Sequence, residues 1–296
     1  MNILIVHGKD IDGNIEDLSG EARGLGHNVT LVSAVDLSAY VDGEVSRFYA
    51  KNAQLEAQDL VLLRGLGRGT CERITKRIGV LSHLEHWGVR VINPVAALLN
   101  ARNKYLTMCN LARAGISIPP TFITESALQA YRSARAMKKI VYKPIIGSMG
   151  YGSLKFEDPD LAYNAFQSLE MIGRPMMVQE YLPSASKDIR VFVIGQRAAA
   201  AMTRQAPPNG WKSNVSQGGR ASPTSLVPEL SELAIKSTEA LGLEYSGVDV
   251  AEIPGKGYCV LEVNASPSWQ ALRQTTSVNV PRELLLYALG KTQGRS

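Results

Sequence analysis

The stretch VYKPIIGSMGYGSLKF, residues 141–156, places three glycines directly behind a short β-like run that ends in Lys143. Glycine permits positive φ and close backbone approach, so successive N–H groups can point at phosphate oxygens. Three interpretations compete: a loop for nucleotide phosphates, a dinucleotide fingerprint, or a turn between strands. The spacing of Gly147, Gly150 and Gly152 matches neither a Walker loop nor GxGxxG, and RGLGRG at residues 64–69 matches neither pattern fully. The loop alone does not decide.

Length and composition describe a globular chain of more than one subdomain. A chain of 296 residues is too long for one ordinary core, and 45% hydrophobic with 20% charged residues is typical of a soluble protein. The net charge of +5 is modest, so it fits an anionic small substrate and does not require nucleic acid. The three cysteines lack CxxC spacing, which indicates reduced thiols in a cytoplasmic protein. No apolar segment reaches membrane-spanning length, so we expect no membrane partner.

Strand-like and helix-like stretches alternate over the first hundred residues, as in NILIVH, NVTLVS, DLVLLRG and VRVIN. This alternation predicts an α/β domain with a parallel sheet covered on both faces. A helix is expected to follow, with Asn93 as its N-cap. After about residue 185 the pattern changes to paired strands, which predicts an α+β arrangement. We expect three parts: residues 1–95, residues 96–185 with the glycine loop, and residues 186–296.

Acidic and amide side chains interrupt two apolar strands near the end of the chain. Glu262 and Asn264 are two residues apart, so they share one face of a strand, and Asp249 lies in the preceding strand of an expected antiparallel pair. Such oxygen ligands suit Mg²⁺ that bridges to substrate phosphates. The alternative is the solvent-facing side of a half-buried sheet. We favour the metal because a glycine-rich loop occurs in the same chain.

Basic residues could complement a triphosphate. Lys143 ends a strand before the glycine loop and Lys104 lies in a predicted helix, whereas each cation taken alone is more often a solvated surface charge. Two tryptophans, Trp211 and Trp269, stand beside polar loop residues, a position compatible with the wall of a substrate site. The scattered cations of the last third are Arg190, Arg204, Lys212 and Arg220.

Six ordered motifs together resemble one family. Lys143-Pro144 before the glycine loop, VQEYL, DIRVFVIG, KSNVSQGG, GVDV and LEVNASP follow the order of the ATP-grasp carboxylate–amine ligases, closest to the RimK-like branch. The resemblance covers about residues 90 to 280 and implies an ATP-grasp fold behind a small N-terminal pre-ATP-grasp domain. It also implies ATP and two Mg²⁺ ions, or Mn²⁺, as cofactors, and assembly as a homodimer or homotetramer.

The resemblance assigns roles residue by residue. Arg190 and Arg204 would lie near the acyl phosphate as catalytic residues, Asp249, Glu262 and Asn264 would hold the metal, and the backbone of residues 180–182 would read adenine. The implied substrate contacts are Gln217, Gly218, Gly219 and Ser266. The implied ATP contacts are Lys104, Lys143, Gly147, Ser148, Gly150, Gly152, Glu180, Tyr181, Leu182, Asp188, Lys212, Ser213 and Asn214.

The family chemistry is amide formation through an acyl phosphate, with L-glutamate or a similar amino acid as the amine. The loop GSMGYGS differs from those of the ribosomal-protein-modifying members, and with VNASPSW it resembles ligases for a pterin coenzyme of the tetrahydromethanopterin kind. The alternative acceptors are a ribosomal protein tail, a deazaflavin coenzyme and an amino-group carrier protein. An alternative of another class is a nucleotide-binding regulator with a degenerate site.

Overall fold

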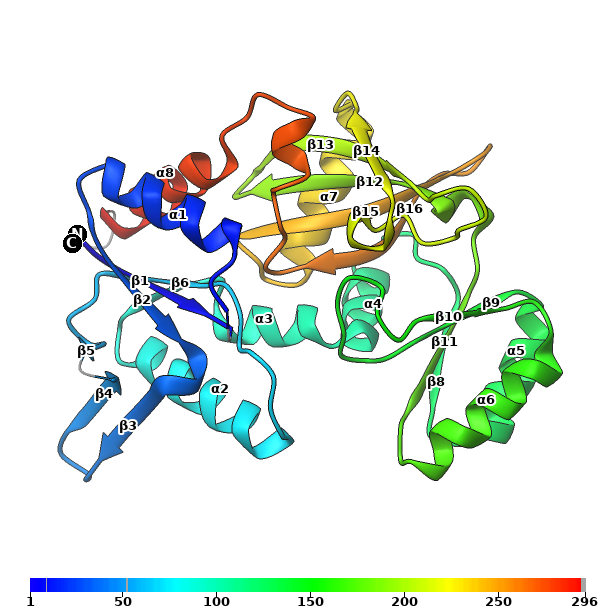
Figure 1. Cartoon of the computed structure of the whole chain (residues 1–296), viewed down its shortest axis with the longest axis horizontal. Helices are drawn as coiled ribbons and strands as arrows, with labels where there is room; N and C mark the ends of the chain where they lie inside the picture. Colours follow the sequence, from blue (N-terminus) through cyan, green and yellow to red (C-terminus); the bar gives the residue numbers. More distant parts are fainter. Residues whose placement is uncertain (9, 52, 294–296) are drawn as a thin grey trace.

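The first lobe is built on a parallel sheet at the left of Figure 1. The computed structural model describes residues 1–8, 10–51 and 53–293. Sheet order is β2-β1-β6-β7, all parallel, as the alternating pattern predicts. Ile3 and Ile5 enter one apolar core and Leu4 and Val6 another, so both faces are covered. The elements are β1 (Asn2–His7), α1 (Gly13–Gly24), β2 (Asn28–Ser33), β6 (Leu60–Leu63), α2 (Cys71–His86) and β7 (Arg90–Ile92).

A small antiparallel sheet that the sequence pattern did not predict lies beside the parallel one (Figure 1). Residues 38–41 of its first strand are all exposed, and Phe48 of the next strand anchors the sheet in the core of the first lobe. Its strands are β3 (Leu37–Val41), β4 (Ser46–Ala50) and β5 (Ala53–Gln54), preceded by the 3₁₀ helix η1 (Ala34–Asp36).

The second lobe, at the right of Figure 1, is an antiparallel sheet of order β10-β9-β11-β8 covered on one face by two helices. Its apolar core contains Ala130, Tyr142, Phe166 and Val178. The elements are β8 (Thr121–Thr124), α5 (Ala127–Met137), β9 (Ile140–Lys143), β10 (Leu154–Phe156), α6 (Pro159–Met171) and β11 (Met176–Glu180).

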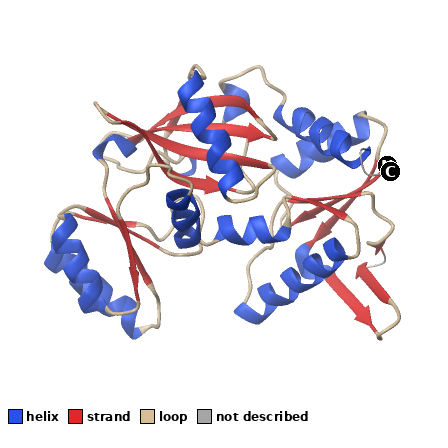
Figure 2. Ribbon diagram, turned by 180° about the vertical axis from the view of Figure 1, so that it is seen from behind, coloured by secondary structure: helices blue, strands red, loops and turns tan. Residues whose placement is uncertain are grey.

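The third lobe is an antiparallel sheet of order β14-β13-β12-β15-β16, with α7 on its back (Figure 2). Val191, Val248 and Val250 point into the core beneath α7. The elements are η2 (Pro183–Ser186), β12 (Lys187–Ile194), β13 (Arg197–Gln205), η3 (Val215–Gln217), β14 (Arg220–Pro223), α7 (Pro228–Ala240), β15 (Tyr245–Ile253), β16 (Gly257–Asn264) and η4 (Leu272–Gln274).

Packing crosses the boundaries expected at residues 95 and 185. Helices α3 (Val95–Arg102) and α4 (Lys104–Arg113) contribute to the core of the third lobe, and α8 (Val280–Gln293) lies against α1 (Figure 1). One apolar cluster joins Ile3 of β1 to Trp269. The division into three parts therefore stays a prediction. Among the described residues, no helix is long and apolar enough to cross a membrane.

Asn93 is not a helix cap, which corrects the sequence interpretation. Pro94 occupies the position before α3, and the wholly buried Asn93 side chain instead bridges the first and third lobes. Its amide donates to the carbonyls of Tyr245 (2.9 Å) and Ala265 (2.7 Å). Its oxygen accepts from the backbone N–H of Glu244 (2.7 Å) and Tyr245 (3.1 Å). A cap is a local feature, whereas these partners are distant in sequence.

Replacing Asn93 by Ala should lower the free energy of unfolding by about 3 kcal/mol, because several buried backbone groups lose their partner. Urea denaturation followed by circular dichroism measures it. Asn28→Ala is the matched control, since the Asn28 side chain is exposed and should change stability by no more than about 0.5 kcal/mol. Equal effects of the two substitutions would contradict the bridging role.

Candidate active site

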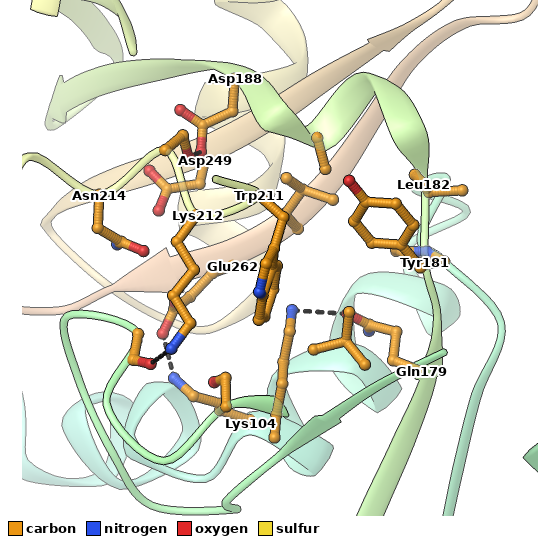
Figure 3. Close-up of a pocket in the computed structure, with 18 of the residues that line it drawn as sticks. Lys104, Gln179, Tyr181, Leu182, Asp188, Trp211, Lys212, Asn214, Asp249 and Glu262 are labelled. Atoms are coloured by element: carbon orange, nitrogen blue, oxygen red, sulfur yellow. Dashed lines mark hydrogen bonds and ion pairs between the residues drawn. The ribbon is translucent and has the colours of Figure 1, made fainter. Parts of the chain in front are cut away.

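A cleft lies between the sheets of the second and third lobes (Figure 3). β9, β11 and the glycine loop form one wall, and the polar face of the five-stranded sheet forms the other. The sequence-predicted residues that line this cleft are Lys104, Lys143, Gly147, Ser148, Gly150, Glu180, Tyr181, Leu182, Asp188, Arg204, Lys212, Ser213, Asn214, Asp249 and Glu262.

Strand register gathers the charged residues on one face of the five-stranded sheet. Asp249 lies directly opposite Arg190 on one side and Glu262 on the other. Asp188 lies opposite Arg204. Directly opposed residues of antiparallel strands project to the same face, so these five side chains form one continuous polar surface. The alternative of an ordinary solvent-facing sheet does not hold, because Asp188, Arg204 and Asp249 are buried.

Two arginines hold Asp249. Arg190 binds it through Nε to Oδ1 and through Nη2 to Oδ2 at 2.7 Å, and Arg204 Nη2 lies 2.9 Å from Oδ2. Arg204 also forms a fork with Asp188, at 2.8 and 2.6 Å, and Ser213 Oγ donates to Asp188 at 2.8 Å. Every buried charge in this network therefore faces an opposite charge, as burial requires.

The arginines set the ionisation of Asp249. Burial alone raises the pKa of this carboxyl, but the ion pairs with Arg190 and Arg204 outweigh burial and hold the pKa at about 2. Burial lowers the pKa of Arg204, whereas Asp249 and Asp188 more than reverse that effect and raise it. Asp249 thus stays ionised at neutral pH, whereas burial raises the pKa of the Asp188 carboxyl in spite of its ion pair with Arg204.

Two lysines approach from the opposite wall. Lys104, the first residue of α4, pairs with Glu262 and donates to the carbonyl of Gly147 at 3.1 Å. Lys143 donates to Gln179 Oε1 at 2.6 Å, and burial lowers the pKa of this lysine. Its hydrogen-bond partner is a neutral amide, so a bound anion would add counter-charge to that of the nearby Glu262 and Asp249 carboxylates.

The glycine loop lies against the lysines of the cleft and accepts hydrogen bonds from two of them, Lys104 and Lys212. Lys212 Nζ donates to the carbonyl of Gly150 at 2.7 Å, which ties the loop to the third lobe (Figure 3). Gly150 has a φ of +73°, and a Cβ there would lie 2.8 Å from Asn214 Oδ1. Both its conformation and the lack of space therefore require glycine. Gly152, with a φ of +75°, lines the neighbouring cavity behind the loop.

The aromatic end of the cleft lies where β11 runs into the third lobe. Tyr181 and Trp211 meet edge to face with ring centroids 6.3 Å apart, and the Lys155 ammonium lies 4.9 Å from the Tyr181 ring centroid. Trp211 lines the cleft as the sequence interpretation allowed. Trp269 is fully buried, so it belongs to the core and not to a substrate wall.

Some predicted residues lie outside this cleft. Arg190, Asn264 and Ser266 line an adjoining cavity. Ser148 and Glu262 line both this cavity and the cleft. Residues 217–219 line neither the cleft nor the two cavities next to it. A Cβ on Gly219 would lie 2.1 Å from the Ser213 carbonyl oxygen, so close packing accounts for that glycine.

The donor set fits a hard cation. Asp249, Glu262 and Asn264 share the polar face, and oxygen ligands are those Mg²⁺ prefers. Among the described residues, Glu262 Oε2 and Asn264 Oδ1 carry no hydrogen bond, while Glu262 Oε1 faces Lys104. Both oxygens of Asp249 accept from arginines, so this carboxylate would have to exchange a guanidinium for the ion.

Sequence reasoning missed two contributors to this region. Gln179 bridges Lys143 to Thr121 Oγ1 (2.8 Å), and only the register of β9 against β11 reveals it. Arg64, at the end of β6, donates to Tyr245 Oη (3.0 Å) and to the Pro267 carbonyl (2.8 Å). Arg64 belongs to the RGLGRG stretch, which the sequence analysis noted for its glycines. Its place beside a cavity depends on how the first lobe packs against the third, which the sequence does not reveal.

The chain matches the RimK-like ATP-grasp domain model over residues 101–288. It is 30% identical to the tetrahydromethanopterin:alpha-L-glutamate ligase of Methanosarcina acetivorans, over 86% of this chain and 87% of that protein. It is 35% identical to the ligase of the same name from Methanocaldococcus jannaschii, over 78% of this chain and 79% of that protein. It is 32% identical to a probable alpha-L-glutamate ligase of Haemophilus influenzae, over 70% and 69%.

Solved structures share the fold. The ATP-grasp ligase PsnB in complex with a minimal precursor superposes with a TM-score of 0.76 at 21% identity, covering 97% of this chain and 98% of PsnB. The RimK-domain ATP-grasp protein of Sphaerobacter thermophilus gives a TM-score of 0.71 at 20% identity, over 98% of this chain and all of that protein. With the family model matching well over half of its length, the chain belongs to the RimK-like ATP-grasp family of ligases.

Proposed function

We propose that this ligase joins L-glutamate to a carboxylate of a small-molecule coenzyme, of the tetrahydromethanopterin kind. The observation that carries the proposal is one cleft in which Lys104, Lys143 and Lys212 face the carboxylates of Asp249 and Glu262 beneath a glycine loop. Cations on one side and hard-oxygen ligands on the other suit a metal-bound triphosphate. Relatives at 30% and 35% identity that carry the tetrahydromethanopterin ligase name support this acceptor.

The reaction has two steps. The acceptor carboxylate attacks the γ-phosphorus of ATP, and the bond to the β-phosphate oxygen breaks, which leaves an acyl phosphate and ADP. The amino group of glutamate then attacks the acyl carbon and loses a proton. The tetrahedral intermediate collapses to an amide and inorganic phosphate. No covalent enzyme intermediate is needed, so the protein acts by positioning and by charge.

The chain's own residues have distinct tasks in this scheme. Lys104 and Lys143 bind the phosphates, and the backbone at Glu180 to Leu182 receives the adenine beside Tyr181 and Trp211. Arg190 and Arg204, held in place by Asp249 and Asp188, present fixed positive charge where the transferring phosphoryl group develops negative charge.

Mg²⁺, when bound, would neutralise phosphate charge, and Glu262, Asn264 and Asp249 are the residues that would hold it. Binding of two ions, and use of Mn²⁺, stay predictions.

The glycine loop would close over the acyl phosphate and exclude water, which would otherwise hydrolyse it. We expect this chemistry in the cytoplasm, with the three cysteines reduced. Assembly of two or four copies also stays a prediction. Light scattering after size-exclusion chromatography measures the molar mass of the assembly and so tests it.

Mass spectrometry of reaction products tests the proposal directly. The protein is incubated with ATP, Mg²⁺, L-glutamate and tetrahydromethanopterin, and ADP release is followed in parallel. We expect a product heavier by one or more glutamyl residues. A ribosomal protein tail, a deazaflavin coenzyme and an amino-group carrier protein are run as competing acceptors. Glutamylation of one of these alone would overturn the pterin assignment, and ATP binding without turnover on any of them would favour a regulator.

Glu262→Gln should lower the ligation rate at least about a hundredfold, because the charge that faces both Lys104 and the metal is lost. ADP release at saturating substrates measures it. Glu252→Gln is the matched control, since Glu252 lies on β15 of the same sheet but is exposed, and should retain full activity. Circular dichroism shows that both variants are folded. An active Glu262→Gln protein would remove this residue from the proposed metal site.

Gly150→Val should lower turnover far more than stability. The substitution places a branched side chain at a φ of +73° against Asn214 and displaces the loop from Lys212. Gly255→Val is the matched control, because Gly255 has a φ of +72° with open space around it. Both variants should lose about 1–2 kcal/mol of stability from backbone strain. If both retain wild-type kcat, the loop is a turn and not a lid.

A further inference from the structure

The loop RGLGRG, residues 64–69, builds one wall of a cavity next to the nucleotide cleft. Arg77, buried in α2, fixes this loop by donating to the carbonyls of Leu66 (2.6 Å) and Arg68 (2.9 Å). Arg64 is held by neutral oxygens and lies over the Trp269 ring, 4.5 Å from its centroid. These arginines are thus positioned by carbonyl, hydroxyl and aromatic groups and not by carboxylates.

Arg68 and Arg102 complete the cavity and have no ion-pair partner among the described residues. Arg68 is exposed at the tip of the loop. Arg102 ends α3, and its Nε is buried without a hydrogen-bond partner. Burial and the nearby Arg77 guanidinium both lower the pKa of Arg102. A half-buried arginine beside another arginine is costly to maintain unless an anion compensates it.

The cavity contains almost no acid to supply that compensation. Its described lining holds Arg64, Arg68, Arg102 and Lys104, and Glu262 is its sole carboxylate. Glu262 is already paired with Lys104. The three arginines therefore face a cavity in which the protein provides no free negative charge. This is the arrangement expected of a site for an oxyanion, which an arginine fork binds well.

The position of the cavity indicates which ligand brings the anion. It shares Lys104, Gly147, Ser148 and Glu262 with the nucleotide cleft, so a molecule that fills it reaches the site of phosphoryl transfer. Its opposite wall is the glycine loop, which presents the exposed side chains of Ile146, Met149 and Tyr151. An acceptor with an apolar body and an anionic end matches both walls.

We propose that Arg68 and Arg102 bind an anionic group of the acceptor, a phosphate or a second carboxylate, separate from the carboxylate that becomes the amide. Arg77 acts as a positioning residue for this site. The identity of the ligand as the acceptor rests on the proposed function, whereas the presence of an oxyanion site does not. The substrate class is accordingly an acceptor with at least two anionic groups.

Calorimetric titration tests the site without turnover. The protein is first saturated with Mg²⁺ and a non-hydrolysable ATP analogue, so that the nucleotide cleft is filled. Inorganic phosphate and glutarate are then titrated separately, which distinguishes a phosphate site from a carboxylate site. We expect one of them to bind, and binding to weaken roughly ten- to a hundredfold in Arg102→Met and Arg68→Met, as for loss of a charge-assisted contact. Arg132→Met, an exposed arginine on α5, is the control and should bind as wild type.

Two further readouts separate this site from a structural role. Arg102→Met should keep or raise the melting temperature, because it removes an unpartnered buried nitrogen. With an acceptor that the wild type glutamylates, both variants should raise the acceptor KM at unchanged ATP KM. Failure of wild type to bind either anion, or undiminished binding by both variants, would overturn the site. Absence of turnover with intact anion binding would instead count against the proposed acceptor alone.

Discussion

Asp249 is held between two arginines on one face of the five-stranded sheet, and much of the molecule is organised around that constraint. A buried carboxylate needs opposite charge. Arg190 supplies it from the neighbouring strand β12, and Arg204 supplies it from β13, one strand further along the sheet. Arg204 in turn requires Asp188. The register of β12, β13 and β15 is thereby fixed by charge as well as by backbone pairing, since a slip of one residue would turn every member to the apolar face.

The same face changes character along the strands. Phe192 follows Asp188 and Arg190 at a spacing of two residues and enters the apolar cluster shared with the first lobe. At one end of the sheet, polar residues on this face therefore line the cleft. At the other end, apolar residues on the same face pack against the first lobe. This division places the arginine-rich loop of the first lobe beside the cleft. Under the two proposals above, nucleotide charge and acceptor charge would be met by different lobes.

Local pattern predicted the elements of this fold well. The parallel sheet of the first lobe and the pairing of β15 with β16 both followed from the pattern of apolar and polar residues along the chain. The resemblance placed most cleft residues, because its motifs lie in the strands that line the cleft. Asn93 was misread since its partners are about 150 residues away, and Gln179 was missed because its role depends on the register of β9 with β11. Neither fact is local.

The apolar cores join the first and third lobes and leave the second lobe apart. One cluster contains buried residues of both the first and the third lobe, whereas the second lobe has a core of its own, formed by residues between Ala127 and Val178. Among the described residues of that second lobe, Met177 is the one whose buried side chain belongs to the core of the third. An unbranched thioether adapts its shape readily, so this apolar contact tolerates small shifts without opening a void. Polar contacts complete the attachment of the second lobe, since Lys104 donates to the Gly147 carbonyl and Lys212 donates to the Gly150 carbonyl.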